Sequence, residues 1–311
     1  QVYNGTPSGN SACVSAVDAT KGIVLKNGGA YTATYYSASN GGQTESILNA
    51  WGTSGLSYLS VKDDPFDLAN TDSVVRKATI YANAQTNGSS LQSLLKTKAV
   101  AGLSALGYAS NSSNTTVTAI NNISPHTPMY ASPSRLYTKM DFSLTASTKS
   151  AGGGTTTANV TVTCGIFSEL ESLLGLSIQS SKNELWSVAQ SGGNFSIQAR
   201  RYGHGIGLSQ RGAMYMGKNG YRYDQILGFY FDNSTRVGCT FTNTIFAAGS
   251  SEVITTEQSS AATDAPTSTA TASADSTTVI SGPSATVRDA QGYLRVSMDE
   301  NSAMILSLSS G

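Results

Sequence analysis

The chain has 311 residues, 39% of them hydrophobic, which is enough for one large or two modest domains with buried cores. Only 12% of the residues are charged, against about 25% in an ordinary soluble domain, and the 19 positive side chains balance the 19 negative ones. A nucleic-acid partner requires a basic face, and because the sequence has no basic cluster, the composition excludes nucleic acid as a partner.

Polar uncharged residues take the place of the charged ones, as is typical of exported proteins of the bacterial surface. The sequence contains 31 glycines and 15 tyrosines and is rich in Ser, Thr and Asn. It has no apolar stretch of about 20 residues, so we expect no transmembrane segment. The first residue is Gln1 and no signal peptide follows it, so we expect the natural start of the protein to lie upstream.

The three cysteines, Cys13, Cys164 and Cys239, are far apart in the sequence. Their odd number permits at most one intrachain disulfide and leaves one thiol over. Because the sequence has no C-x-x-C motif and no His-rich tract, we expect no zinc site and no other cofactor. The interpretation we favour for the cysteines is that of small buried hydrophobic residues.

The first predicted elements are a hairpin and a loop. Residues 14–36 predict two strands around a turn, with Asn27 and Gly28 as the hairpin signal. A polar, glycine-rich loop follows over residues 37–46 and carries Glu45 near its end.

A second loop carries Asp63 and Asp64 directly before a proline, so we interpret them as turn acids. Residues 71–84 are ambiguous between helix and strand. Residues 90–103 have apolar side chains three and four apart, which predicts a helix with Ser90 as its cap.

The next region is Thr- and Val-rich with alternating polarity over residues 115–163, which favours antiparallel strands. A short helix is predicted over residues 167–176, and a hairpin over residues 185–203 around Gly192 and Gly193. The predicted fold class is therefore mixed α+β, with largely antiparallel strands and a few packed helices.

The amino-acid composition changes after Phe246. Residues 247–280 have almost no large apolar side chains, so they cannot offset their ordering entropy and are predicted to form a disordered Ser/Thr/Ala linker. Alternation returns over residues 281–311, which we interpret as the start of a second β-rich module. The main domain is then expected over residues 1–246.

A glycine-flanked histidine is the most informative local feature. Gly203, Gly205 and Gly207 allow positive φ and close approach to the backbone. Ser209 is predicted to cap a helix whose free N–H groups suit an oxygen-rich or anionic group, and His204 lies just before it. The alternative for His204 is a buried imidazole that bonds two backbone groups.

Three generic motifs do not fit this segment. A nucleophile elbow needs G-x-S-x-G, and the stretch from Gly207 to Gly212 has one residue too many. A dinucleotide fingerprint lacks its third glycine. A metal site lacks partners, because the only other histidine, His126, lies in a segment between prolines that we expect to be a loop.

Four motifs in order carry a family resemblance. The segment from residue 203 reads "GHGIGLSQRGAMYMGKNGYRYDQILGFYF", and upstream come "AVDATKGIVL", "YYSASNGGQTES" and "WG…SYLSVKDDPFD". Together they closely resemble the carboxy-terminal part of the stage II sporulation protein D family, also called the amidase-enhancer family. The resemblance covers about residues 1–246.

The resemblance implies an extracytoplasmic protein that acts on the glycan strands of peptidoglycan, in sporulation and engulfment, beside a partner cell-wall amidase. Enzymes of the family are lytic transglycosylases, in which one carboxyl group acts first as acid and then as base. Their catalytic glutamate, and the Cys and His zinc ligands of some clostridial relatives, lie in a helical region upstream of this sequence. We therefore expect this chain to lack its catalytic acid, to be inactive by itself, and to be anchored, if at all, through that upstream segment.

The resemblance and the loop chemistry together predict a substrate-binding set without a catalytic residue. Its members share a place in the two glycine-rich loops or beside them: Tyr202, His204, Ser209, Gln210, Ser37, Ser39 and Glu45. Glu45 has the alternative role of bonding its own loop. Two other functions stay open, a non-catalytic glycan-binding enhancer of a cell-wall amidase and a Ser/Thr-rich adhesin or stalk.

Overall fold

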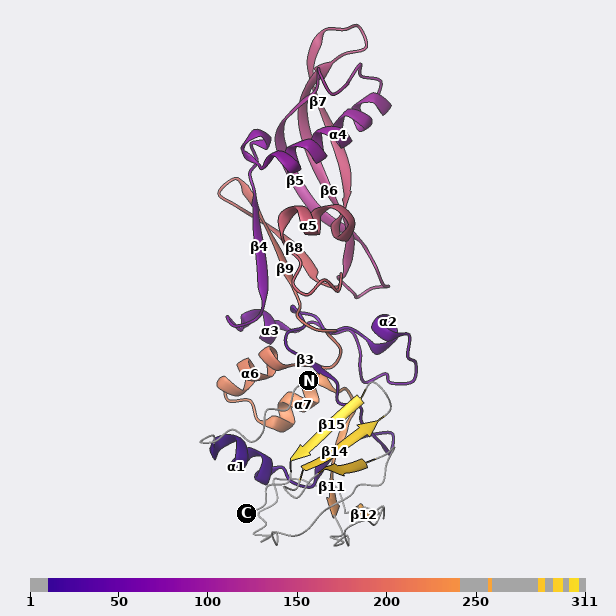
Figure 1. Cartoon of the computed structure of the whole chain (residues 1–311), viewed down its shortest axis with the longest axis vertical. Helices are drawn as coiled ribbons and strands as arrows, with labels where there is room; N and C mark the ends of the chain where they lie inside the picture. The colour runs from indigo at the N-terminus through magenta and orange to yellow at the C-terminus, as the bar shows by residue number, and fades with distance from the viewer. Residues whose placement is uncertain (1–10, 241–256, 259–284, 289–292, 299–301, 308–311) are drawn as a thin grey trace. The chain divides into compact units, whose positions relative to one another are not determined.

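A computed structural model describes residues 11–240, 257–258, 285–288, 293–298 and 302–307 (Figure 1). It confirms the mixed α+β class with mainly antiparallel pairing. The chain divides into two compact units, one formed by residues 36–232 and the other by the segments on both sides of it.

The unit made by the outer segments contains a four-stranded antiparallel sheet in the order β12-β11-β1-β2. The predicted hairpin is confirmed, since Asn27 pairs with Ala30 across a turn in which Gly28 and Gly29 both have positive φ. The elements are α1 (Ser11–Ala19), β1 (Ile23–Asn27), β2 (Ala30–Tyr31), β11 (Thr235–Thr240) and β12 (Glu257–Gln258).

One prediction for this unit is wrong. The chain is helical over Ser11–Ala19, where residues from 14 onward were expected to form a strand. The segment contains three alanines, the strongest helix formers, and lacks a clear alternation of apolar and polar residues.

A further antiparallel sheet follows near the end of the chain, formed by β13 (Ala285–Arg288), β14 (Tyr293–Met298) and β15 (Ser302–Ser307). Apart from β12, the predicted linker over residues 247–280 lies outside the described residues. The linker and the boundaries at residues 246 and 280 remain predictions.

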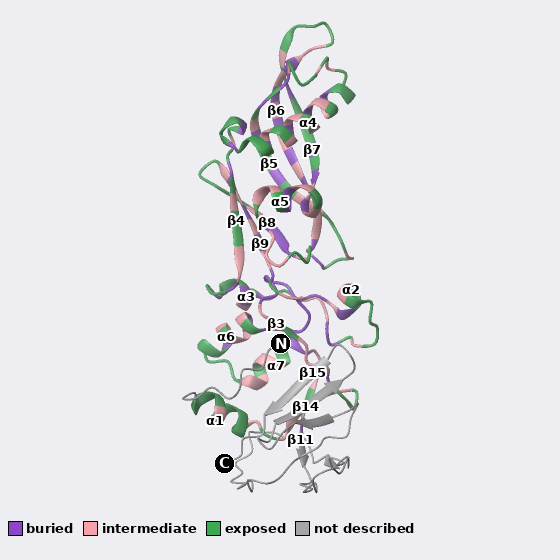
Figure 2. Cartoon of the chain, in the orientation of Figure 1, coloured by how far each residue is buried: buried purple, intermediate pink, exposed green. Residues whose placement is uncertain are grey.

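The unit of residues 36–232 is built around an antiparallel sheet in the order β5-β6-β7, as the alternation predicted. Phe142 pairs with Ile123 and Val162 on the face that α4 covers, and burial alternates along β6 and β7 (Figure 2). The strands are β5 (Thr116–Pro128), β6 (Tyr137–Lys149) and β7 (Thr155–Gly165).

The predicted helix is α4 (Ser89–Ala105), which lies across this sheet (Figure 1). Its buried side chains recur every fourth residue and face the strands: Leu91, Leu95, Ala99 and Leu103. The predicted cap is wrong, because Gly88 occupies the N-cap position without a side-chain hydrogen bond and Ser90 lies within the first turn.

The ambiguous segment is a strand, β4 (Val75–Ile80), which pairs with β9 (Asn194–Arg200). The predicted hairpin around the glycine pair is confirmed by β8 (Leu185–Ser191), and the sheet order is β4-β9-β8. The short helix is also confirmed, as a π turn over Ile166–Leu170 followed by α5 (Glu171–Leu174).

His126 lies in strand β5 and not in a loop. It pairs with Lys139, and its Nε2 atom lies 3.0 Å from the Asp141 carboxylate on the neighbouring strand. The flanking prolines are tolerated because β5 is an edge strand of its three-stranded sheet.

The remaining elements of this unit carry the predicted site. They are β3 (Tyr36–Ser37), α2 (Ile47–Trp51), α3 (Pro65–Ala69), β10 (Leu208–Ser209), α6 (Gln210–Lys218) and α7 (Tyr223–Tyr230). The predicted cap at Ser209 is confirmed, since its hydroxyl accepts from the Gly212 amide at 3.1 Å. Asp64 caps α3 in the same way, in agreement with its interpretation as a turn acid.

Candidate functional site

The two glycine-rich loops lie side by side in the structure. Ser39 and Tyr202 exchange backbone hydrogen bonds of 3.1 and 2.8 Å, and the Glu45 amide donates to the Gly205 carbonyl at 2.8 Å. Strands β3 and β10 pair in parallel beside these bonds. The two loops that carry the predicted residues therefore lie close together, although they are far apart in the sequence.

Arg201 holds the first loop in place, and the sequence analysis missed it. The side chain is buried, and it donates to the carbonyls of Asn40 at 3.1 Å and Gln43 at 3.0 Å. Burial lowers the pKa of its guanidinium, while the nearby Glu45 carboxylate raises it. A buried cation that bonds loop carbonyls fixes the backbone on which the site is built.

The Glu45 side chain bonds to its own loop and lies beside Arg201. It is only 2% exposed, and one carboxylate oxygen lies 3.7 Å from the Arg201 guanidinium. The other oxygen accepts from the Ser46 amide at 3.1 Å and the Asn49 side chain at 2.8 Å. This environment favours the alternative role for Glu45, that of bonding its own loop, over contact with substrate.

Asp67 joins the two loops from the opposite side and was also missed. Its carboxylate accepts from the hydroxyls of Ser39 at 2.9 Å and Ser209 at 2.5 Å, and from the Asn40 amide at 3.1 Å. All of these groups are buried. Because their hydroxyls are used inside the protein, we assign Ser39 and Ser209 to supporting the loops.

The glycines around His204 are required by backbone geometry. Gly203 has a φ of 111° and Gly205 a φ of 77°. A Cβ atom at Gly203 would lie 2.6 Å from the Ser37 Cβ, and one at Gly205 would lie 2.9 Å from the Arg201 side chain. Any other residue would combine an unfavourable backbone with a collision.

His204 is half-buried and presents a neutral imidazole. Its Nδ1 atom accepts from the Ile206 amide at 3.0 Å, and the ring also bonds to the backbone of Tyr36. Burial, with a smaller effect of Arg201, lowers the pKa of the ring below its ordinary value. The ring also lies against Trp51, with 5.0 Å between ring centroids.

Exposed aromatic side chains lie on the segments that meet at His204. Trp51 is 43% exposed at the end of α2, a short helix that Ser46 caps, and Tyr202 is 45% exposed. Tyr36 is exposed as well. The sequence analysis missed Trp51, although the aromatic character of its segment was visible.

Two predicted polar residues differ in their exposure. Gln210 is exposed in the first turn of α6, where the sequence predicted a contact residue. The Ser37 hydroxyl is buried, and no partner for it is found among the described residues. An unpartnered buried hydroxyl costs about 1–3 kcal/mol, and because this one is out of contact with the surface, Ser37 supports the loop beside Gly203.

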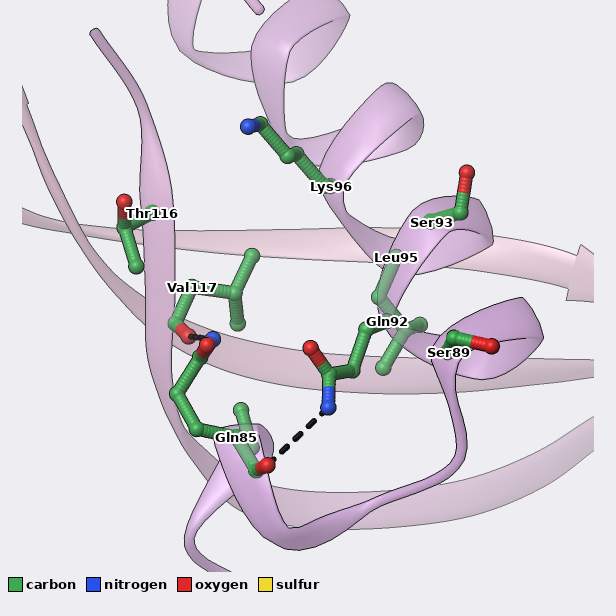
Figure 3. Close-up of a pocket in the computed structure, with 9 residues that line it drawn as sticks. Gln85, Ser89, Gln92, Ser93, Leu95, Lys96, Thr116 and Val117 are labelled. Carbon is green, nitrogen blue, oxygen red and sulfur yellow. Dashed lines mark hydrogen bonds between the residues drawn. The ribbon is translucent and has the colours of Figure 1, made fainter. Parts of the chain in front are cut away.

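The described residues also include a cavity that lies apart from this site. Within the described part of the chain, no group of three His, Cys, Asp or Glu side chains could hold a metal ion. A cavity of about 280 Å³ lies elsewhere, between α4 and β5, where Gln92 donates to the Gln85 carbonyl (Figure 3). Of the cysteines, Cys164 is buried as expected, whereas Cys13 is exposed.

The chain is similar in sequence to a known bacterial protein. No family model matches it. It is similar to a protein named amidase enhancer from Bacillus subtilis (strain 168), with 29% identity over 252 residues. The resemblance to the amidase-enhancer family is confirmed. The match covers 76% of this chain but 34% of the relative, so the chain spans about a third of that amidase enhancer.

None of the described helices is long and apolar enough to cross a bilayer.

Proposed function

We propose that this chain is part of an extracytoplasmic protein that acts on peptidoglycan, and that the site around His204 binds the glycan strand. The observation that carries the proposal is the composition of the exposed surface. It combines the aromatic side chains of Trp51, Tyr202 and Tyr36 with a neutral imidazole and a glycine-rich backbone. A sugar polymer is bound by this combination of aromatic faces and hydrogen-bonding groups.

The charged side chains around the two loops are engaged by protein groups, so the proposed ligand is bound through its hydroxyls, amides and ring faces. Arg201 and Glu45 are buried and lie 3.7 Å apart. Arg135 and Asp63 are at least partly exposed, but they pair with each other at 2.9 Å beside the first loop. The site therefore offers backbone groups, amides and aromatic rings, and the charged side chains beside it are already paired. His204 acts here as a binding and orienting group, because its lowered pKa keeps it neutral at neutral pH.

For the parent protein we propose lytic transglycosylase chemistry, as the family motifs imply, in wall remodelling such as engulfment. The described site contributes binding, and a carboxyl group outside it supplies the proton. The second candidate is a non-catalytic enhancer of a cell-wall amidase. The observation behind this alternative is the name of the similar Bacillus protein.

Binding to denuded glycan strands tests the site. Tyr202→Ala and Trp51→Ala should each weaken binding about tenfold, equivalent to about 1.4 kcal/mol, with an unchanged melting temperature because both side chains are exposed. Tyr81→Ala is the matched control, since Tyr81 is also exposed but lies at the end of β4. Equal affinity of all three variants would reject the site.

His204→Ala should also weaken binding about tenfold. The variant loses the bond to the Ile206 amide, so a stability loss of about 1 kcal/mol is expected beside the binding effect. Unfolding of the variant together with normal glycan binding by the folded fraction would show that His204 is only structural.

Product analysis separates the two functions. The chain alone should produce no 1,6-anhydro ends from denuded glycan, and robust product would contradict the assignment of proton transfer to a group outside the site. Stimulation of a purified cell-wall amidase by the chain, without glycan cleavage, would select the enhancer.

A further inference from the structure

A loop outside the family motifs holds the backbone in front of His204. Gln179 accepts from the Gly203 amide at 3.0 Å and donates to the Gly203 carbonyl at 3.2 Å. Asn183 donates to the same carbonyl at 3.0 Å. Both peptide groups of Gly203 are thus fixed by side chains of residues 177–184, so the position of this loop determines where the imidazole lies.

The loop is itself held by a buried carboxylate. Glu184 is buried, and its two oxygens accept from the Ile178 amide at 2.9 Å and the Asn183 amide at 3.1 Å. Ser180 and Lys182 have positive φ, a conformation that non-glycine residues adopt only when surrounding contacts impose it. The loop therefore depends on the Glu184 bonds for its shape.

A second buried carboxyl group faces the first. Glu171, the first residue of α5, is 7% exposed, and its Oε1 atom has no hydrogen-bond partner among the described residues. Two carboxyl groups in contact and out of water cannot both be ionised at low cost.

The environment of Glu171 favours its protonated form. Burial is the largest cause that raises its pKa, and the charge of Glu184 raises it further. The Ser177 hydroxyl and the Lys182 ammonium act in the opposite direction. The charged groups that act on Glu171 are thus Glu184 and Lys182, both from the same loop.

We propose that Glu171 and Glu184 share one proton and form a latch that holds loop 177–184, and through Gln179 and Asn183 the Gly203–His204 backbone, in its binding position. The four residues are positioning residues and do not touch the glycan. This inference rests on the proposed glycan site for its functional consequence, but the latch itself can be observed without any ligand.

The direction of the pH dependence follows from the raised pKa of Glu171. A group whose pKa is raised by folding stabilises the folded state at low pH, and this contribution is lost as pH rises through the raised value. The loop should be held most firmly below the ordinary glutamate pKa, and opening should increase by up to about tenfold per pH unit until the pH reaches the raised Glu171 pKa.

Hydrogen exchange of the whole chain tests the latch directly. The Ile178, Asn183 and Gly203 amides are the bonded groups. After correction for intrinsic exchange rates, their protection should fall by up to about tenfold per pH unit between the ordinary glutamate pKa and the raised Glu171 pKa, and it should level off above the raised value. Glu171→Gln should keep protection high across the range, because glutamine stays neutral.

Glu169→Gln is the matched control. Glu169 lies two residues before Glu171, but it accepts from the Gly165 amide at 2.7 Å and pairs with Lys98, so the variant should retain the pH dependence of the loop. Gln179→Ala provides a second test that does not alter the carboxyl pair. It should expose the Gly203 amide to exchange while leaving the Ile178 and Asn183 amides protected.

The outcomes separate the latch from the glycan site. Loop protection that ignores pH in the parent chain, or that still falls in Glu171→Gln, would overturn the latch. A glycan affinity that falls with rising pH in the parent chain but not in Glu171→Gln would support the full inference. Loop opening that follows Glu171 without any change in glycan affinity would overturn the link between the latch and the site, while the latch would stand. The proposed function is decided separately, by the Tyr202 and Trp51 variants.

Discussion

Replacing Arg201 with methionine should destabilise the protein by about 3–5 kcal/mol, because the change leaves a buried carboxylate without its cation. Glu45 is 2% exposed and lies 3.7 Å from the Arg201 guanidinium. The variant also removes the donors to the Asn40 and Gln43 carbonyls. Since domains are stable by about 5–15 kcal/mol, the loss would be a large part of the total.

Because Arg201 pairs with Glu45, the stability losses caused by substitutions at these two positions should not be additive. Glu45→Gln removes the charge that methionine leaves uncompensated, so the double variant should be more stable than the sum of the single losses by about 1 kcal/mol or more. Urea unfolding followed by fluorescence and circular dichroism would measure all three variants. An additive result would show that the two charges do not interact.

Arg200→Met is the matched control for this cycle. Arg200 is adjacent in sequence and partly exposed, and its guanidinium bonds to the Gln198 side chain on the same strand. Its loss should therefore cost about 1 kcal/mol or less. If the Arg200 and Arg201 variants were equally stable, the reasoning from burial would be refuted.

Three further outcomes follow from the geometry. Gly203→Ala should lower the free energy of unfolding in urea by more than about 2 kcal/mol, because Gly203 has a φ of 111° and an added Cβ would lie 2.6 Å from the Ser37 Cβ. An unchanged stability would contradict the argument from backbone geometry. Ser209→Ala should cost about 1–2 kcal/mol through its lost cap, and an unchanged midpoint would argue against that bond. Burial raises the pKa of the Cys164 thiol to about 12. Iodoacetamide at pH 8 should therefore modify the exposed Cys13 before Cys164. Equal rates of modification in peptide mapping would contradict the burial of Cys164.

Local patterns predicted much of the secondary structure. The recurrence of apolar residues in α4, the alternation along β5 to β7 and the Asn27-Gly28 turn each depend on neighbours within a few residues. The failures are local too. The helix over Ser11–Ala19 and the cap of α4 are places where the pattern was weak or where a glycine took the position of the expected serine.

The site was predicted in outline but not in its internal bonding. The glycine spacing located His204, and the family motifs located both loops. Arg201 and Asp67 were missed because their partners are 161 and 142 residues away, as in the bonds to Asn40 and Ser209. No periodicity in a single sequence indicates such a pair, so the supporting roles of buried residues emerged only from the structure.

The long sequence separation of these contacts has a consequence for biogenesis. A contact between residues 161 apart closes a very long chain segment, and such contacts form late and slowly. During synthesis or export, a chain whose Arg201 has not yet been made can fold the β5 to β7 sheet, because the pairings of that sheet are short-range. Its first glycine-rich loop still lacks the hydrogen bonds from Arg201. The proposed glycan surface can therefore form only after the segment that carries Arg201 has been made.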